Sequence, residues 1–433
     1  MRWLGAVQSL FFAGQIAHCM VLNGTQIVHE LGSILSNGSS IYLPADADWD
    51  TETTQRFDTW HAPTYVVSVK PALTTDVQKV VRYATLHNIS FLATGGGHGY
   101  SGSLGALQNG LELDLGYFNS VTVDAANNLM TVGGAVRFSD VEEPCYAVGK
   151  AFPVGACPCV GLAGASLGGG IGFYSGLYGA ISDSLVSAEV ITGTGALVTA
   201  SESENSDLLW AIKGAGSSYG VATSLTYRVY DYLNDGYAMN ADMLFSASQM
   251  SSLFTFAKSW LEKQRKELSI TFSLIYVATL QEVIHASVPY ALNLYEIGVE
   301  DLTAAVQYFN DTVASTAALQ GVFLAFTQYA QYGFQQHPQN SSSFPYRDVA
   351  IQIDGSAASD DDVPIIDSFE REFRDRLVNI SGKDELEVYM QFSHGDEGAD
   401  AWFSAANVPK LRELKRRYDP LDLFRFYNSV DVD

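Results

Sequence analysis

The chain has 433 residues, of which 47% are hydrophobic, and this length accommodates two or three domains with cores of ordinary size. Its 24 basic residues face 48 acidic ones, and the formal net charge of -24 disfavours nucleic-acid and membrane-surface partners. The charged fraction of 17% and the 38 glycines exclude a disordered chain, a coiled coil and a collagen. With four cysteines, disulfides are not the main source of stability.

The N-terminus has the features of a secretory leader. Arg2 precedes an apolar run over residues 3–17 that is too short to span a bilayer, so residues 1–19 are expected to be a signal peptide. A retained N-terminal helix is the alternative. Glycosylation triplets occur at Asn23, Asn37, Asn88, Asn310, Asn340 and Asn379. The leader and the triplets together predict a secreted, N-glycosylated protein.

The first half of the chain alternates strands and helices around two glycine-dense stretches. Residues 20–57 are polar and are interpreted as a lead-in to the first domain. Apolar periodicity predicts a helix at 74–84 and another from residue 207. It predicts strands at 65–69, 90–93, 111–115, 120–124, 129–133, 188–192, 196–200 and 221–229. The glycine-rich character ends near Tyr232, which predicts a domain boundary there.

The second half has few glycines and longer amphipathic segments. The pattern predicts helices at 248–264, 299–320, 363–377 and 408–417. It predicts strands at 268–279, 321–329, 348–354 and 385–393. A second domain with a mixture of strands and helices follows from this order.

The first glycine stretch contains the string GxGxxG over residues 97–102, directly after a strand. A Rossmann fold needs a helix next and an acidic residue about 20 positions later, whereas another strand follows here. The Rossmann interpretation therefore fails. Two interpretations stay open: backbone N–H groups that wrap an anion such as a pyrophosphate, or a glycine-rich turn.

The second glycine stretch carries two candidate reactive residues that fit no familiar motif. Cys157 and Cys159 are too close for a CxxC pair, and the eight histidines lack HxxxH spacing, so no metal site is expected. Residues 164–168 fit the string GxSxG around Ser166. A nucleophile elbow needs a strand before the serine and a helix after it, but glycines continue on both sides, which disfavours a serine hydrolase.

Taken together, the motifs resemble those of the berberine bridge enzyme-like flavoproteins, within the vanillyl-alcohol oxidase and p-cresol methylhydroxylase superfamily. The matching strings are Thr94-Gly-Gly-Gly-His98-Gly, Cys157-Pro-x-Val160-Gly161 and Leu167-Gly-Gly-Gly-x-Gly172. Similar stretches follow in family order to about residue 430, and the glycine-and-serine form of 214–220 is most similar to fungal secreted members.

The resemblance implies an α+β fold in which a two-part FAD-binding domain of the p-cresol methylhydroxylase type comprises residues 58–231 and 400–433. The substrate domain, 232–399, would have an antiparallel sheet backed by helices. FAD would be the cofactor, bonded bicovalently through His98 to the flavin 8α-methyl group and through Cys157 to ring carbon 6. Cys159 stands at the threonine of the family string Cys-Pro-Thr-Val-Gly.

Both links suit the chemistry, because an imidazole or a thiolate can attack an electron-poor ring. The alternatives are a turn histidine at 98 and a disulfide from Cys157 to Cys145 or another cysteine, although Cys145 is expected to be a buried free thiol. The residues expected to contact FAD are Thr94, Gly95, Gly96, Gly97, His98, Gly99, Ser101, Gly102, Cys157, Val160, Gly161, Gly164, Gly168, Gly172, Ile191 and Asn428.

The family reaction is hydride transfer from a substrate carbon to the flavin, commonly followed by reoxidation with oxygen to give hydrogen peroxide. Val160 is the permissive residue at the oxygen-gating position, but Ala165 and Phe403 replace a familiar histidine and tyrosine. The first hypothesis is a monomeric oxidase that uses molecular oxygen on a small organic molecule of fungal secondary metabolism. A secreted oligosaccharide oxidase and a catalytically silent flavin-binding scaffold are the alternatives.

The catalytic base is sought on the two strands expected over the flavin, where every second side chain faces the ring. This alternation groups Gln352 with Asp354, and Tyr389 with Gln391, and His394 follows just beyond the second strand. Tyr389 assisted by Asp354 is the predicted base, with His394 as the substitute. The alternative is that Tyr389 is a core aromatic residue.

Overall fold

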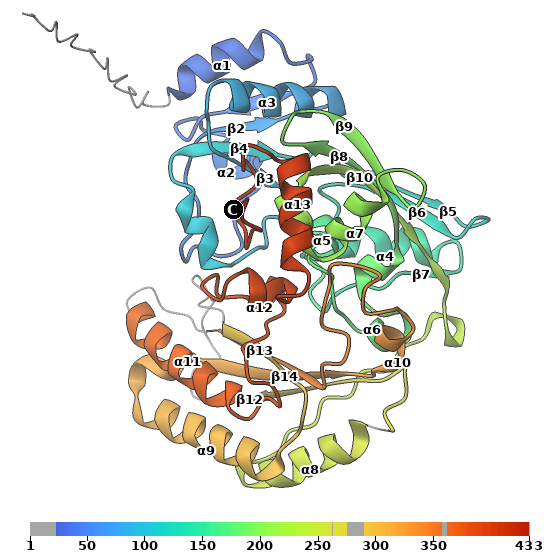
Figure 1. The fold of residues 1–433 in the computed structure, drawn as a ribbon, viewed down its shortest axis with the longest axis vertical. Helices are drawn as coiled ribbons and strands as arrows, with labels where there is room; N and C mark the ends of the chain where they lie inside the picture. Colours follow the sequence, from blue (N-terminus) through green and yellow to red (C-terminus); the bar gives the residue numbers. More distant parts are fainter. Residues whose placement is uncertain (1–22, 262, 275–289, 357–361, 433) are drawn as a thin grey trace, which may run out of the picture.

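A computed structural model describes residues 23–261, 263–274, 290–356 and 362–432, and it shows two lobes (Figure 1). One lobe contains the strands β1 to β10, and the other contains β12 to β15 with the helices α8, α9 and α11. The expected leader, residues 1–19, lies outside the described residues. Within the described part of the chain, no helix is long and apolar enough to cross a membrane.

The first sheet supplies one wall of the site described below. Its strand order is β1 (Ser40–Tyr42), β2 (Tyr65–Lys70), β4 (Gly110–Asp114) and β3 (Phe91–Thr94). Strands β2, β4 and β3 run parallel, because α3 (Thr74–Leu86) returns the chain between β2 and β3. Every residue of β4 is buried, as expected for a strand that is covered on both faces.

The segment interpreted as a lead-in is wrong in part, because it contributes to this sheet. Helix α1 (Gly24–Gly32) precedes β1, which pairs antiparallel with β2. Ile27 and Leu31, four residues apart, form the buried face of α1. The segment 20–57 is polar on average, so these few apolar residues at helical spacing gave no clear signal of a helix.

The second sheet is antiparallel and carries the glycine-dense loops between its strands. Its order is β5 (Val121–Asp124), β6 (Leu129–Gly133), β10 (Gly220–Arg228), β8 (Leu185–Thr192) and β9 (Leu197–Ser201). Between β6 and β8 lie α4 (Phe138–Tyr146), β7 (Lys150–Ala151), α5 (Leu162–Leu167) and α6 (Ser175–Tyr178); α7 (Ser206–Ala215) and β11 (Tyr230–Asp231) flank β10. All the strands and helices predicted for this region form, within a few residues at their ends.

The third sheet forms the second lobe with its covering helices. Its order is β12 (Ser269–Leu274), β14 (Phe323–Tyr329), β15 (Ile351–Ser356) and β13 (Tyr290–Leu294), all antiparallel. The helices α8 (Met250–Leu261), α9 (Val299–Ser315) and α11 (Val363–Val378) lie together on one side of it (Figure 1). The expected antiparallel sheet backed by helices is therefore present. Strand β13 was not predicted, and positions 275–279 of a predicted strand lie outside the described residues.

One predicted strand, 385–393, does not form. The chain is extended to Tyr389 and then makes a 3₁₀ turn over Met390–Phe392. The alternation of polar and apolar residues that suggested a strand reflects a segment buried between the two lobes. Its backbone bonds go to other elements: the Val388 N–H donates to the Ala401 carbonyl, and the Met390 carbonyl accepts from the Asn428 amide.

The C-terminal segment returns to the first lobe. Helix α13 (Val408–Tyr418) follows the short α12 (Ala399–Phe403). The fully buried Lys415 ammonium donates to the Asp419 carboxylate at 2.7 Å and to the Ser218 and Phe424 carbonyls. Because a buried charge must be paired and hydrogen-bonded, these contacts fix the position of the chain after α13.

Candidate active site

A cavity of about 390 Å³ lies where the two sheets of the first lobe meet the segment before α12. Four stretches build most of its wall: the cradle loop (residues 93–100), the thiol loop (155–161), and the segments 389–392 and 424–427. The volume falls in the usual range for small-molecule and cofactor sites. Two glycine stretches far apart in sequence thus face one space.

The cradle loop and the thiol loop touch through their backbones. A Cβ on Gly96 would lie 2.6 Å from the Cα of Gly161, so a side chain at either position would separate the loops. Gly97 has φ +71°, a conformation that favours glycine, and a Cβ there would meet the Gln55 carbonyl. The glycines therefore permit the close approach that brings the next reactive residues together.

His98 and Cys157 face each other across this contact. The Nε2 atom of His98 lies 4.0 Å from the Sγ atom of Cys157, and the imidazole stacks on Phe57 with ring centroids 3.9 Å apart. Burial lowers the pKa of His98, and the nearby guanidinium groups of Arg56 and Arg137 lower it further. A neutral imidazole has a lone pair available for bond formation, so His98 is prepared to act as a nucleophile.

Cys159 lies beside this pair. The ligating atoms of His98, Cys157 and Cys159 are all within 4.8 Å of one another, an arrangement that could also hold a soft metal ion. The spacing argument against a metal site did not foresee this cluster, because His98 joins it from another loop. Cys145, Cys157 and Cys159 are all free thiols, so the alternative of a disulfide between Cys157 and Cys145 is absent, and Cys145 is buried as expected.

The wall near the cradle loop fits an anionic group. The Arg56 guanidinium donates from Nη2 to the Gly99 carbonyl at 2.6 Å, while its buried Nε has no partner among the described residues. An unsatisfied buried donor beside bare glycine backbone suits a ligand that carries a pyrophosphate, as FAD does.

A buried acid lies behind the cradle strand. Glu112 on β4 accepts from the Ser68 hydroxyl at 2.8 Å and is 1% exposed. Burial raises the pKa of Glu112 to about 7, and the neighbouring Asp114 carboxylate contributes in the same direction. At pH 7 the Glu112 carboxyl group is therefore only partly ionised, so it adds less than a full negative charge beside the anion site.

The sixteen residues predicted to bind the cofactor divide into wall residues and supporting residues. The wall contains Thr94, Gly95, Gly96, Gly97, His98, Gly99, Cys157, Val160, Gly161, Gly164 and Gly168. The cavity wall does not include Ser101, Gly102, Gly172, Ile191 or Asn428. Ile191 is a core residue of β8 opposite the wall residue Val221, and a Cβ on Gly172 would meet the Val154 carbonyl, so both support the wall from behind.

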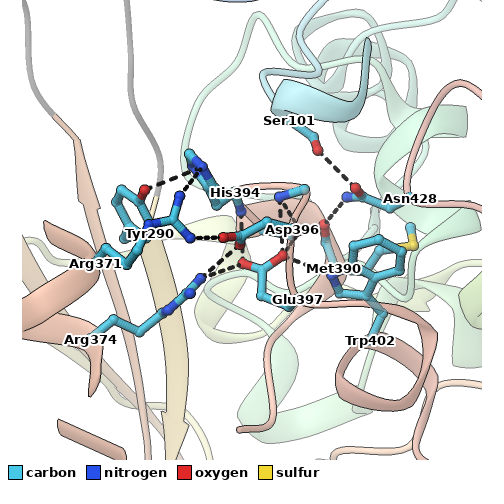
Figure 2. Close-up of polar contacts among 12 residues, drawn as sticks. Ser101, Tyr290, Arg371, Arg374, Met390, His394, Asp396, Glu397, Trp402 and Asn428 are labelled. Atoms are coloured by element: carbon cyan, nitrogen blue, oxygen red, sulfur yellow. Dashed lines mark hydrogen bonds and ion pairs between the residues drawn. The ribbon is translucent and has the colours of Figure 1, made fainter. Parts of the chain in front are cut away.

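Asn428 joins Ser101, directly after the cradle loop, to the segment that precedes α12 (Figure 2). Its Oδ1 accepts from the Ser101 hydroxyl at 2.7 Å, and its Nδ2 donates to the Met390 carbonyl at 3.0 Å. Asn428 has φ +39°, and asparagine tolerates this left-handed region better than most residues. Ser101 and Asn428 therefore hold the walls together.

Two of the predicted catalytic residues, Tyr389 and Gln391, line the cavity. The Tyr389 oxygen accepts from the Gly170 N–H at 3.1 Å, and burial raises the pKa of this phenol. The Gln391 amide donates to the Gly164 carbonyl at 2.6 Å and accepts from the Tyr427 hydroxyl at 2.7 Å. Tyr389 is buried among aromatic residues, as the alternative interpretation expected, but it also contributes to the cavity wall.

His394 is predicted as a substitute base but lies outside this wall, in a network of charged groups between the lobes (Figure 2). Its Nε2 lies 3.2 Å from the Tyr290 hydroxyl and 3.4 Å from the Asp367 carboxylate. Burial lowers the pKa of His394, whose Nδ1 is buried without a partner among the described residues. His394 therefore does not line the cavity in this structure, and its role as a substitute base stays a prediction.

Glu397 anchors the other side of the same network. Its carboxylate accepts from the Ser393 hydroxyl, the His394 and Gly395 backbone N–H groups, the Trp402 indole and Arg374. The guanidinium of Arg371 pairs with Asp396 alongside it (Figure 2). These bonds fix the backbone that follows Tyr389 and Gln391.

Gln352 is buried on β15 and does not line the cavity. It is the cross-strand partner of Asn293 on β13, and both side chains keep amide atoms without partners among the described residues. The pair lies on the opposite sheet face to the core residues Ile351 and Ile353. The side chain of Asp354 lies outside the described residues. Asn293 could not be found from the sequence because its strand was not predicted.

Several wall residues were also missed. Arg56 falls within the segment interpreted as a lead-in, and Tyr427 precedes Asn428 in a stretch without regular structure. A basic and aromatic pair, Arg56-Phe57, directly before the first predicted domain was the available signal for the former.

Ser166 of the GxSxG string lies inside α5, contrary to the expectation that no helix forms there. It is fully buried, and its hydroxyl contacts the Ala163 carbonyl and the Tyr227 hydroxyl. A serine nucleophile is therefore excluded by burial rather than by the absence of a helix.

Comparison with known proteins agrees with this geometry. A family described as FAD binding domain matches residues 66–201, and one described as Berberine and berberine like matches residues 388–431. The FAD-linked oxidoreductase azaL of Aspergillus niger is 37% identical over 88% of this chain and 94% of that protein. The chain belongs to the berberine bridge enzyme-like family of FAD-linked oxidoreductases. A second relative, tazL of Aspergillus terreus, is 32% identical over 93% of each chain.

Solved structures share the whole fold. Physcomitrella patens BBE-like 1 has a TM-score of 0.79 at 19% identity, and the match covers 95% of this chain and all of that one. A glucooligosaccharide oxidase of Acremonium strictum has a TM-score of 0.78 at 19% identity, over 94% and 98% of the two chains. The predicted α+β fold of the p-cresol methylhydroxylase type is confirmed, and the chain is an FAD-dependent oxidoreductase.

Proposed function

We propose that the chain is an oxidase that transfers a hydride from a small organic substrate to an FAD bonded to both His98 and Cys157. Molecular oxygen would then reoxidise the flavin and give hydrogen peroxide. The observation that carries the proposal is the 4.0 Å approach of the Cys157 thiol to the His98 imidazole in the wall of the cavity. Fungal secondary metabolism is the proposed setting, because the relatives named above are fungal FAD-linked oxidoreductases.

A double attachment is supported from two sides. An Acremonium strictum glucooligosaccharide oxidase that shares the fold is described with a 6-S-cysteinyl, 8α-N1-histidyl FAD. In this chain the glycine contact between the loops brings an imidazole and a thiol to one place, as two bonds to the same flavin ring require. When bound, FAD would supply the acceptor for a hydride, which carries two electrons.

The chain's own residues would divide the remaining tasks. The cradle loop and Arg56 would hold the pyrophosphate, while Gln391 and Tyr389 would form the wall nearest the substrate. Val160, three residues after Cys157, would leave room for oxygen.

Tyr389 is the proposed acceptor of the substrate's hydroxyl or amine proton. Only the phenolate form can accept a proton, and burial raises the pKa of this phenol, so Tyr389 is neutral in the resting protein and its own proton must first leave to solvent. The Gly170 N–H that donates to the Tyr389 oxygen would stabilise the phenolate. The phenolate would then take the substrate proton as the hydride leaves, which returns Tyr389 to the neutral phenol.

Covalent attachment is tested by mass spectrometry of peptides from acid-denatured protein. We expect flavin mass on both the His98 and the Cys157 peptides, retention of one bond in His98→Ala or Cys157→Ala, and free FAD from the double variant. Cys145→Ala is the matched control, because this buried thiol lies outside the cavity wall. Protein that contains no flavin after production with ample FAD would refute the proposal.

The reaction is tested by anaerobic stopped-flow reduction and by a peroxidase-coupled assay on alcohols, phenols, amines and oligosaccharides. Reduction by a small alcohol, phenol or amine with peroxide release in air is the expected result. Turnover of oligosaccharides alone would replace the proposal with a carbohydrate oxidase. A flavin that light reduces but no compound reduces would indicate a silent scaffold.

We further propose that the protein follows the secretory route and is N-glycosylated. Five of the six triplet asparagines, all except the half-buried Asn310, are exposed. A mobility shift after treatment of the fungal protein with an N-glycosidase is expected. Unmodified protein retained inside the cell would contradict this proposal.

A further inference from the structure

Cys159 is a second thiol at the flavin attachment point, where the family string has threonine. It is exposed, whereas Cys157 is half-buried in the cavity wall. The two residues belong to one turn, in which the Val160 N–H donates to the Cys157 carbonyl at 3.3 Å and Pro158 separates the cysteines. Burial and a hydrogen bond with Cys157 raise the pKa of the Cys159 thiol.

The turn permits a bond between the two sulfur atoms. Two steps of about 3.8 Å, bent by a turn, leave the Cα atoms of residues 157 and 159 roughly 5–7 Å apart. Disulfides form over Cα separations of about 4.4–6.8 Å, so only a small adjustment of the turn is needed. The Sγ atoms already lie within 4.8 Å of each other.

We propose that Cys157 has two mutually exclusive covalent partners, ring carbon 6 of the flavin and the Sγ atom of Cys159, so that thiol oxidation before flavin attachment leaves the cofactor with a single bond through His98. The inference rests on the proposed attachment of flavin to Cys157. It assigns to Cys159 a role that threonine at the same position could not have.

Both fates of Cys157 are oxidations, and each needs an acceptor of two electrons. Formation of the bond to the flavin replaces the thiol hydrogen and the ring hydrogen with a C–S bond, and two electrons and two protons go to molecular oxygen. Formation of the disulfide proceeds with a small disulfide such as oxidised glutathione. One thiolate attacks it and releases one glutathione; the second thiolate attacks the mixed disulfide and releases the other.

The order of events follows from exposure. In the flavin-free chain Cys159 is accessible to an oxidant, and Cys157 is its nearest thiol among the described residues. Once Cys157 is bonded to the flavin it has no free sulfur valence, and Cys159 stays a lone thiol. The ratio of oxidant to flavin during maturation therefore determines how many bonds hold the cofactor.

The test compares wild-type protein with Cys159→Thr and Cys159→Ser after production with and without added reductant. Peptides mapped without reduction, after free thiols are alkylated, give the fractions of Cys157 that are flavin-bound, joined to Cys159, or free. We expect wild-type Cys157 that lacks flavin to be joined to Cys159. Reductant in the presence of oxygen should convert this disulfide-bonded fraction to flavin-bound Cys157. Without reductant, the fraction of Cys157 that carries flavin should be about twofold or more higher in both variants than in the wild type.

Equal occupancy of Cys157 by flavin in wild type and both variants, under both conditions, would overturn the inference. So would stoichiometric zinc on wild-type Cys157 that lacks flavin, because the three soft ligands would then serve a metal. If Cys157 carries no flavin even in the variants while His98 does, the double attachment itself is wrong. Two Cys159 variants are used so that poor folding of one does not decide the outcome.

Discussion

A single methyl group at Gly164 tests whether the cavity holds the cofactor. Gly164 lies in the wall and in helix α5, and no heavy atom lies within 4 Å of the position that a Cβ would take. Alanine at a helical position stabilises a protein by about 0.5–1 kcal/mol relative to glycine, because it restricts the unfolded chain. Gly164→Ala should therefore leave the flavin-free fold intact or slightly more stable.

The same methyl group projects into the space proposed for FAD. Overpacking of a fitted site costs about 1–3 kcal/mol, which corresponds to roughly 5- to 150-fold weaker FAD binding. The affinity is measured by fluorescence titration in a His98→Ala, Cys157→Ala background, in which FAD is held without covalent bonds. Thermal unfolding with and without FAD gives the stability of each form.

Two further glycines give the contrast that makes the result interpretable. Gly96→Ala should destabilise even the flavin-free chain by about 1–3 kcal/mol, because its Cβ would lie 2.6 Å from the Gly161 backbone. Gly32 ends α1, and an added Cβ there would have no neighbour within 4 Å, so Gly32→Ala should change neither the stability nor the FAD affinity much. FAD binding by Gly164→Ala as tight as that of the parent would refute the assignment of this cavity to the cofactor.

Three other substitutions give separate readouts. Tyr389→Phe should slow flavin reduction about tenfold or more, equivalent to about 1.4 kcal/mol, with covalent flavin unchanged; an unchanged rate would remove Tyr389 as the proton acceptor. Gln352→Met should keep or raise the melting temperature, because a buried unpaired amide is removed, and should leave KM and kcat unchanged, because Gln352 does not line the cavity. A raised KM with an unchanged melting temperature would show that Gln352 contacts the substrate. For Glu112, the folded-state pKa of about 7 exceeds the ordinary value of 4.5, so the folded chain binds more protons between these values and loses stability as pH rises through them. Glu112→Gln should abolish this loss, which amounts to a free energy of unfolding on the order of 3 kcal/mol. The measurement is urea unfolding at pH 5 and pH 8. A difference in unfolding free energy between the two pH values that is the same in wild type and variant would contradict the assignment.

Most strands of the first lobe, though not β1, could be predicted because each carries its own pattern. β2 is mainly apolar, β4 alternates leucines with acidic residues, and α3 shows a buried face at helical spacing. The contact of Gly96 with Gly161 has no such local signal. It depends on how the two sheets pack, and only the family resemblance placed His98 beside Cys157.

The catalytic wall was harder to predict for a related reason. Residues 388–390 are buried, and their neighbours in 386–393 are at least half-buried, so the alternating polarity of this segment does not mark the two faces of a sheet. Asn293 lies on an unpredicted strand whose five residues are all buried, which removes the alternation that marks a half-exposed strand. His394 follows this segment, and it was expected just beyond the end of a strand that does not form.

The hydrogen bond between Ser101 and Asn428 joins residues 327 positions apart, and the segment 424–427 beside Asn428 completes the cavity wall. At about 5–20 residues per second, a ribosome needs roughly 16–65 s to proceed from the first of these residues to the second. Throughout that interval the cradle loop exists without its last wall. A closed cavity can therefore hold FAD only after residue 428 has emerged, while the exposed thiol turn meets the surrounding solution from the start.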